Sequence, residues 1–163
     1  ISKGISFETE VLDCSVVQAP PKVASLLNIT TDSQVLLLKR VRSVADTPLI
    51  LLHNYVVYDL CPGIEQVDFS KYRLFETLEE KSGLVLDWGR RYFEAQAASP
   101  AVADLLGISV CDPIMSLEQV VYLNDGTPVE LSDVWLRGDR FRLSATVRRD
   151  GLTDPSMSWI EEA

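Results

Sequence analysis

The chain has 163 residues, and its 24 acidic and 15 basic side chains give a formal charge of −9. This length allows one domain, and the 47% hydrophobic content suffices for a core without disulfides or metal. The acidic balance argues against bulk electrostatic binding to nucleic acid, and no apolar run approaches the roughly 18–20 residues of a membrane span.

The first part of the chain is predicted to form a strand, a helix and a hairpin. Residues 7–14 alternate loosely, as in an edge strand. Residues 20–27 are predicted to be helical, because proline suits the first turn of a helix. The β-branched and aliphatic runs 35–44 and 49–58 are joined by the turn 45–48, which predicts a hairpin.

The rest of the chain is predicted to contain two helices and four strands. One helix is expected around residues 70–82, with Gly83 ending it. The clearest helix start in the chain is Ser99 as N-cap before a proline, and Gly107 ends that helix. The expected strands are residues 88–97, 113–123, 128–137 and 141–148. The tail from Asp150 is expected to be frayed.

Two segments of the chain repeat each other. Residues 23–55 align with residues 102–135 with one gap at Gly126, and 11 of the 33 aligned pairs are identical. Each copy is a short helix, a strand, a turn and a second strand. One copy cannot close a core, whereas two hairpins side by side can form one antiparallel sheet with helices on a face. The sequence therefore predicts an α+β fold with an internal duplication of a helix–hairpin unit.

The sharpest difference between the copies is a pair of arginines, Arg40 and Arg42. They share one face of their strand with two leucines, because strand side chains alternate. The second copy has Gln119 and Val121 at these positions, so the fold does not require the arginines. Two neighbouring buried guanidiniums are costly unless an anion satisfies them, and arginine suits bidentate binding of phosphate or carboxylate.

A carboxylate inside the protein is the alternative partner for these arginines. Glu130, which aligns with Ile50 of the first copy, is one candidate and Asp133 is another. Glu130 could also serve both purposes, by holding an arginine and accepting a hydrogen bond from a sugar hydroxyl. A ligand site and an internal ion pair both remain open from spacing alone.

No other constellation points to catalysis, a metal or a cofactor. His53 has no nucleophile with a recognisable signature near it, and Gly-rich phosphate loops and metal-ligand clusters are absent from the sequence. The three cysteines are widely spaced, which favours a reduced, cytoplasmic protein. The tripeptide that begins at Arg137 is interpreted as a strand-end turn, with Asp139 paired to Arg137 or Arg140.

Several short motifs follow one another in a distinctive order. They are Arg-x-Arg at Arg40 and Arg42, Thr47-Pro48, ADLLGI at 103–108, DGTPVELS at 125–132 and LRGDRF at 136–141. This series resembles the UTRA domain, the effector-binding domain of GntR-family transcription regulators of the HutC subfamily. The resemblance covers roughly residues 7–148.

The resemblance implies a chorismate-lyase-like fold with a small-molecule pocket between the sheet and the helices. In relatives that sense sugar phosphates, the Arg-x-Arg pair holds the anionic group and the residue equivalent to Glu130 contacts the ligand. These three residues carry over, and the full set of candidate ligand-binding residues is Arg40, Arg42, Glu130, Arg73, Tyr55 and Ser132. Arg73 would supply a third positive group. Departures at Leu52, Arg73 and Leu136 disfavour an amino-sugar phosphate, so the effector stays open among sugar phosphates, phosphonates and carboxylates.

The resemblance also implies a longer parent protein. Such regulators carry an N-terminal winged helix-turn-helix, which is not expected within these 163 residues, so contact with DNA would run only through that missing domain. The parent is expected to be a cytoplasmic homodimer without membrane or catalytic function. Two alternatives remain: an enzyme on the same fold acting on chorismate or a similar diacid, and a purely dimerising module.

Overall fold

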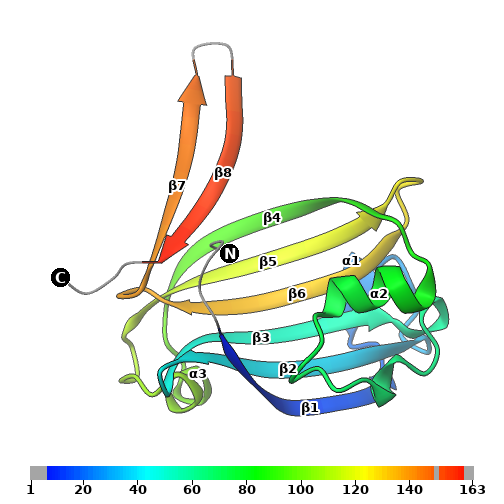
Figure 1. The fold of residues 1–163 in the computed structure, drawn as a ribbon, viewed down its shortest axis with the longest axis horizontal. Helices are drawn as coiled ribbons and strands as arrows, with labels where there is room; N and C mark the ends of the chain where they lie inside the picture. The colour runs from blue at the N-terminus through cyan, green and yellow to red at the C-terminus, as the bar shows by residue number, and fades with distance from the viewer. Residues whose placement is uncertain (1–6, 149–150, 160–163) are drawn as a thin grey trace.

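The computed structural model describes residues 7–148 and 151–159 and contains one large antiparallel sheet, short helices and a separate two-stranded ribbon (Figure 1). The elements in chain order are β1 (Glu8–Gln18), α1 (Pro21–Leu26), β2 (Gln34–Val44), β3 (Thr47–Val57), the 3-10 turns η1 (Tyr58–Leu60) and η2 (Ile64–Gln66), α2 (Leu74–Ser82), β4 (Leu86–Ala97), α3 (Pro100–Leu106), β5 (Pro113–Leu123), β6 (Pro128–Arg137), β7 (Phe141–Arg148) and β8 (Gly151–Trp159).

The strand order of the large sheet reproduces the internal repeat. The order is β1-β2-β3-β6-β5-β4, and all neighbours are antiparallel. The first copy contributes β1, α1, β2 and β3, and the second contributes β4, α3, β5 and β6 in the same sequence. The copies meet where β3 pairs with β6. The repeated unit is therefore one strand longer than the aligned segments.

Both hairpins contain a β-bulge at the same place. In the first hairpin Leu49 is the extra residue, because Arg42 pairs with Ile50 while Ser43 pairs with Pro48. In the second hairpin the register shifts in the same way, and Val129 is the extra residue next to a proline. Proline cannot donate to the ladder, which is why bulges accommodate it.

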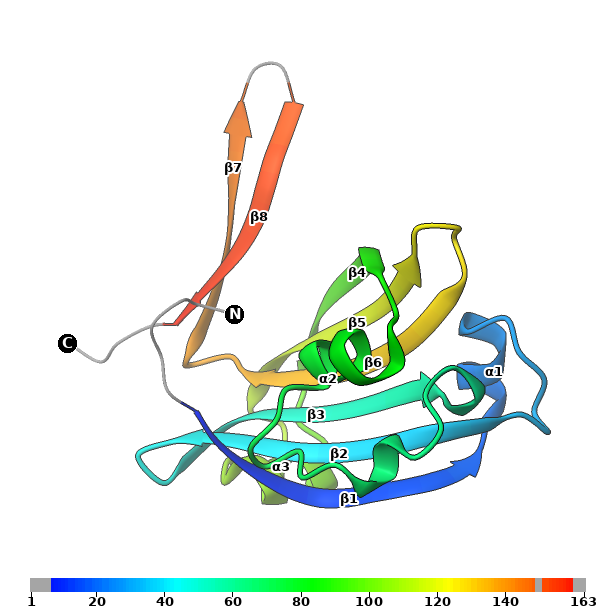
Figure 2. The same cartoon turned by 45° about the vertical axis from the view of Figure 1, so that its right-hand side comes forward.

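Helices cover both faces of the sheet. The face that carries Arg40 and Arg42, here called the arginine face, packs against α2 through a core that includes Leu38 and Leu78. On the opposite face α1 packs through residues such as Val23, and α3 through residues such as Leu106. Figure 2 shows α2 in front of the sheet and the other two helices behind it. Both faces of the central strands are thus buried, as their apolar sequences require.

The predicted elements are confirmed with shifted ends and one error. The helix expected from residue 70 begins at Leu74, because Ser70 is held in a turn in which its amide and hydroxyl donate to Asp68. The expectation of a frayed tail from Asp150 is wrong for residues 151–159, which form β8 and pair with β7. This hairpin projects from the large sheet as a separate ribbon (Figure 1). Across residues 7–148 and 151–159, no helix is long and apolar enough to cross a membrane.

Candidate anion-binding site

The site is built on the centre of the arginine face. Arg40 lies on β2, is only 3% exposed, and has its guanidinium 6.0 Å from the ring centre of Phe69. Arg42 follows two residues later on the same face and is partly buried. The start of β2 holds this face in the core through Leu36 and Leu38, both fully buried. The two guanidiniums therefore project from a strand whose first half is fixed in the apolar core.

The register of the sheet brings three more polar side chains to this face. Asn54 of β3 lies beside Ser132 of β6, and Glu130 lies one register step further along β6. Arg40 Nη2 donates to Asn54 Oδ1 at 2.8 Å, and Asn54 Nδ2 donates to Glu130 Oε1 at 2.8 Å and to Ser132 Oγ at 3.0 Å. Ser132 Oγ donates to Glu130 Oε1 at 2.5 Å. A continuous polar network thus runs across three strands inside the protein.

Three buried polar atoms of this cluster have no hydrogen-bond partner among the described residues. They are Nε of Arg40, Nε of Arg42 and Oε2 of Glu130. A buried polar atom left unpaired costs about 1–3 kcal/mol, and more if it is charged. Most such atoms in native proteins do have partners. The cluster therefore holds two donors and one acceptor whose hydrogen bonds the described residues do not supply.

Burial and mutual repulsion set the protonation of the cluster. Burial, and next the charge of Arg42, lower the pKa of Arg40 to about 10, and the charge of Glu130 opposes this shift. Burial also lowers the pKa of Arg42. Glu130 is fully buried, and this burial raises its pKa to about 7 against the hydrogen bonds from Asn54 and Ser132. At neutral pH both arginines stay charged, while the raised pKa of Glu130 favours its protonated form more than in water, and in that form the carboxyl can donate as well as accept.

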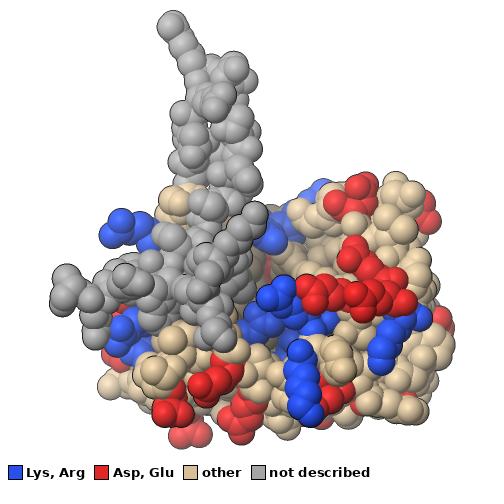
Figure 3. All heavy atoms as spheres, viewed as in Figure 1, with Lys and Arg blue, Asp and Glu red and all other residues tan. Residues whose placement is uncertain are grey.

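Arg73 lies near this cluster but on its outer side. It precedes α2 as the N-cap residue, and its exposed side chain pairs with Glu76 at 2.9 Å. Its charge contributes to the lowered pKa of Arg42, which places positive charge from α2 next to β2. Figure 3 shows basic and acidic side chains side by side in the middle of this face. Arg73 therefore lies at the exposed edge of the cluster, paired with Glu76.

Tyr55 is the one candidate that the structure places away from the cluster. It pairs with Leu37 and Leu131, which point to the opposite face of the sheet, and it packs against the core beneath α1. The structure thus brings together Arg40, Arg42, Glu130 and Ser132, with Arg73 at the edge, and separates Tyr55 from them.

The two carboxylates considered as internal partners of the arginines are arranged differently. Asp133 lies on the opposite face and pairs with Lys22 at 3.1 Å, so it does not reach Arg40. Glu130 lies on the correct face, but Asn54 is interposed between it and Arg40. An internal ion pair therefore forms only indirectly, and it leaves both Nε atoms unsatisfied.

Sequence reasoning missed Asn54 and a further polar pair on the same row. Gln119 of β5 lies beside Ser132, and Arg91 of β4 lies beside Gln119. Arg91 Nε donates to Gln119 Oε1. The hairpin register could have revealed Asn54, but only if the bulge at Leu49 had been known.

An open hollow of about 470 Å³ lies over this second half of the arginine face, and we call it the β4 hollow. Its lining includes Phe75, Asp87, Arg91, Phe93, Gln119 and Val121. Phe75 comes from α2 and the other five from β4 and β5. The hollow therefore adjoins the polar row and is closed on one side by α2.

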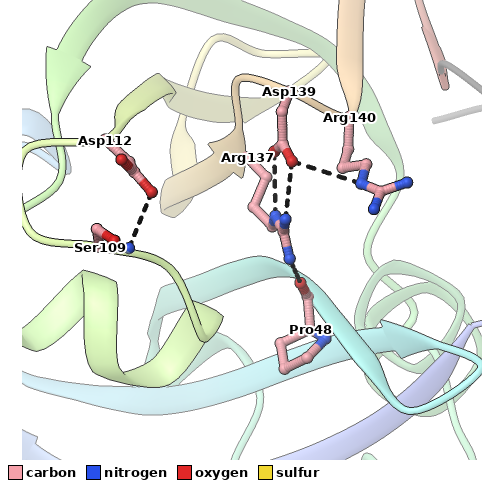
Figure 4. Close-up of polar contacts among 6 residues, drawn as sticks. All are labelled: Pro48, Ser109, Asp112, Arg137, Asp139 and Arg140. Atoms are coloured by element: carbon pink, nitrogen blue, oxygen red, sulfur yellow. Dashed lines mark hydrogen bonds and ion pairs between the residues drawn. The ribbon is translucent and has the colours of Figure 1, made fainter. Parts of the chain in front are cut away.

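The RGDR segment has a structural role at the corner between β6 and β7 (Figure 4). Arg137 donates to both carboxylate oxygens of Asp139, at 3.1 and 2.8 Å, and to the carbonyl of Pro48 at 3.5 Å. Arg140 Nε lies 3.5 Å from the same carboxylate. A Cβ on Gly138 would lie 2.5 Å from the carbonyl oxygen of Pro113, so glycine is required there. The predicted strand-end turn is confirmed, with Asp139 paired to both arginines.

The described residues contain no group of three or more side chains that could hold a metal ion. His53 lies on the face opposite the arginines, half-buried, with its ring edge-on to Trp135 at 4.8 Å between centroids. Burial lowers its pKa, and it has no hydrogen-bonded nucleophile in the described structure.

The family model of the UTRA domain matches residues 2–142. The chain is 27% identical over 152 residues to the HTH-type transcriptional regulator Rv0792c of Mycobacterium tuberculosis, covering 91% of this chain and 55% of that protein. It is 22% identical over 140 residues to the HTH-type transcriptional repressor NagR of Bacillus subtilis, covering 86% of this chain and 57% of that protein. The chain thus spans somewhat more than half the length of these relatives.

A solved structure shares the fold. The C-terminal domain of the histidine utilization repressor from Pseudomonas syringae pv. tomato superimposes with a TM-score of 0.82 at 19% identity. The match covers 88% of this chain and all of that chain, and it confirms the predicted α+β architecture. With the family model matching most of its length, the chain belongs to the UTRA domain family.

Proposed function

We propose that this chain is the small-molecule effector-binding domain of a GntR-family transcription regulator, and that it binds an anionic metabolite on the arginine face. Arg40 and Arg42 would hold the anionic group, and Glu130 would contact a hydroxyl, with Ser132 orienting Glu130. The observation that carries the proposal is the set of unpartnered buried atoms on Arg40, Arg42 and Glu130. The names of the relatives, which are regulators and repressors, support it.

The second copy of the repeat supplies the variant that tests the site. Arg40→Gln combined with Arg42→Val places the residues of the second copy, Gln119 and Val121, into the first. We expect glucitol 6-phosphate and inorganic phosphate to stabilise the unaltered chain against heat, by about 2.7 kcal/mol at 100 times the dissociation constant. The double variant should fold and show no such stabilisation.

A distinct set of results would contradict anion binding at this site. If no phosphate compound changes the melting temperature of the unaltered chain and the double variant unfolds, the arginines serve an internal network instead. Arg42→Val alone, at the less buried arginine, keeps the comparison interpretable if the double variant does not fold. A response to phosphate that survives in that variant would remove Arg42 from the site.

Binding without turnover is part of the proposal. The rival assignment is a lyase that releases pyruvate from chorismate. We expect no pyruvate when the chain is incubated with chorismate, measured by a coupled dehydrogenase assay. Steady pyruvate release would replace the sensor assignment by an enzyme.

We further propose that the parent protein is a cytoplasmic homodimer that contacts DNA through a separate helix-turn-helix domain. Such a regulator reads two half-sites related by its own symmetry. The effector can control DNA binding only as far as it binds one arrangement of the dimer better than the other. Light scattering after size exclusion should give twice the chain mass, and a monomer at micromolar concentration would contradict dimerisation through this domain.

A further inference from the structure

A second guanidinium faces the cluster from the far edge of the sheet. Leu38, Asn54, Ser132, Gln119 and Arg91 form one register row across β2, β3, β6, β5 and β4. Arg40 reaches into this row from one end through Asn54, and Arg91 reaches into it from the other end through Gln119. From Asn54 to Gln119 the row is therefore a polar strip, bonded by Arg40 at its β3 side and by Arg91 at its β5 side.

The spacing of the two side chains that these cations bond fits a small extended molecule. The guanidinium of Arg40 bonds a side chain of β3, and that of Arg91 bonds a side chain of β5. These two strands are separated only by β6, so they lie about 10 Å apart, at about 4.8 Å per strand spacing. Between them the row offers the hydroxyl and amide groups of Ser132, Asn54 and Gln119.

The β4 hollow provides space at the Arg91 end of the row. Its volume of about 470 Å³ lies within the common range of ligand pockets, about 300–1,000 Å³. Phe75 and Phe93 supply apolar walls, while Arg91 and Gln119 supply polar contacts. Asp87 is the carboxylate in the lining, at the bulge between Leu86 and Trp88, and it adds negative charge to the rim.

The repeat shows that this second cation is a property of the second copy. Gln119 is the counterpart of Arg40, and their partners on the edge strands are Arg91 and Val11 respectively. On this face the first copy therefore carries two guanidiniums on β2, and the second carries one on the edge strand β4. Both copies direct one cation at the same polar strip.

We infer that Arg91 is a specificity-determining residue that binds a second anionic group, so that the ligand is an elongated molecule with an anion at each end. This inference rests on the proposed function, since Arg40 and Arg42 must hold the first anion. A charge-assisted hydrogen bond from Arg91 to the second anion would make the chain bind such a ligand more tightly than one with a single anionic group.

Two probes that differ only at one end test the inference. 6-Phosphogluconate and glucitol 6-phosphate are six-carbon chains with the same phosphate, and they differ in having a carboxylate or a hydroxymethyl group at carbon 1. By isothermal titration calorimetry we expect the unaltered chain to bind 6-phosphogluconate at least about tenfold more tightly, the change expected for one added hydrogen bond between charged groups.

The matched variants are Arg91→Gln and Arg90→Gln. Arg91→Gln should reduce the affinity ratio of the two probes to about one. Arg90 pairs with Val120 and so points to the opposite face, and Arg90→Gln should keep the ratio of the unaltered chain. Both arginines are exposed, so neither change should unfold the chain, which a thermal scan verifies.

The outcomes separate this inference from the proposed function. Equal affinities of the unaltered chain for both probes would overturn the role of Arg91 and leave the first anion site standing. A tenfold preference that survives Arg91→Gln would assign the second anion to another group. If neither probe nor inorganic phosphate binds, both proposals fail together.

Discussion

The two copies of the repeat share a scaffold and differ on the arginine face. Each has a helix on the far face, a hairpin and a bulge beside a proline. On the arginine face, however, the first copy carries Arg40 and Arg42 beneath α2, whereas the second carries Gln119 and Val121 beside the β4 hollow. Because the second copy carries neither arginine at these positions, we expect the scaffold to fold without them. The difference marks the side chains that we propose for binding.

The largest expected effect is the pH dependence that Glu130 gives to the free energy of unfolding. Its counterpart in the first copy is Ile50, so the second copy carries a buried carboxyl where the first is apolar. Burial raises the pKa of Glu130 in the folded chain to about 7 from its ordinary value of 4.5. Because the folded state binds the proton more tightly, the free energy of unfolding should fall as pH rises from about 4.5 to about 7 and level off above. One pKa unit corresponds to about 1.4 kcal/mol, so the loss is about 3 kcal/mol.

Glu130→Gln isolates this effect. The variant keeps the acceptor Oε1 and removes the titration, so its unfolding free energy in urea should not show this fall between pH 5 and pH 8. His53, whose pKa is lowered by burial, stabilises the fold as pH rises through its range, and it does so equally in both proteins. The difference between the two pH profiles therefore reports Glu130 alone. Parallel profiles would show that Glu130 titrates as it does in the unfolded chain.

The copies stop matching directly after their second hairpin strands. The first copy continues into the 3-10 turn η1, whereas the second turns a corner at Gly138. Gly138→Ala should lower the free energy of unfolding by about 1–3 kcal/mol, because its Cβ would overlap the backbone of Pro113 and force a shift. Gly89→Ala is the control, since a Cβ there meets neighbours only at 3.4 Å or more. Equal urea midpoints for the two variants would rule out a steric requirement at the corner.

The helix starts give the smallest expected difference between the copies. Ser99 caps α3 by accepting from the amide of Val102 at 3.4 Å, while its counterpart Pro20 at the start of α1 makes no side-chain cap. Ser99→Ala should lower the free energy of unfolding by about 0.5–1 kcal/mol, as expected for a long cap bond. Ser109→Ala is the control, because Ser109 bonds Asp112 through its backbone amide. A loss no larger than in this control would show that α3 needs no cap.

Local sequence patterns were sufficient to predict most helices and strands and half of the candidate site. Apolar runs, prolines and the Ser99 cap defined the strands and helices, since these signals act within one turn or hairpin. Alternation along β2 placed Arg40 and Arg42 on one face, and comparison of the copies singled out Glu130. The strand Gly151–Trp159 escaped prediction because its pairing with β7, rather than its own composition, orders it.

Only the tertiary structure decided which other residues face the arginines. Val44 pairs with Thr47 next to the turn between β2 and β3. If the two strands continued from there without a bulge, Tyr55 would lie on the arginine face. The bulge at Leu49 shifts the register by one residue, and because strand side chains alternate, this shift turns Tyr55 away and brings Asn54 in. The sequence by itself thus determined the repeat, the arginine pair and the carboxyl of Glu130, which stands where the first copy has an apolar residue. The row that leads to Arg91, which Arg40 reaches through Asn54, depends on the order and register of five strands. Local sequence patterns do not encode that order and register.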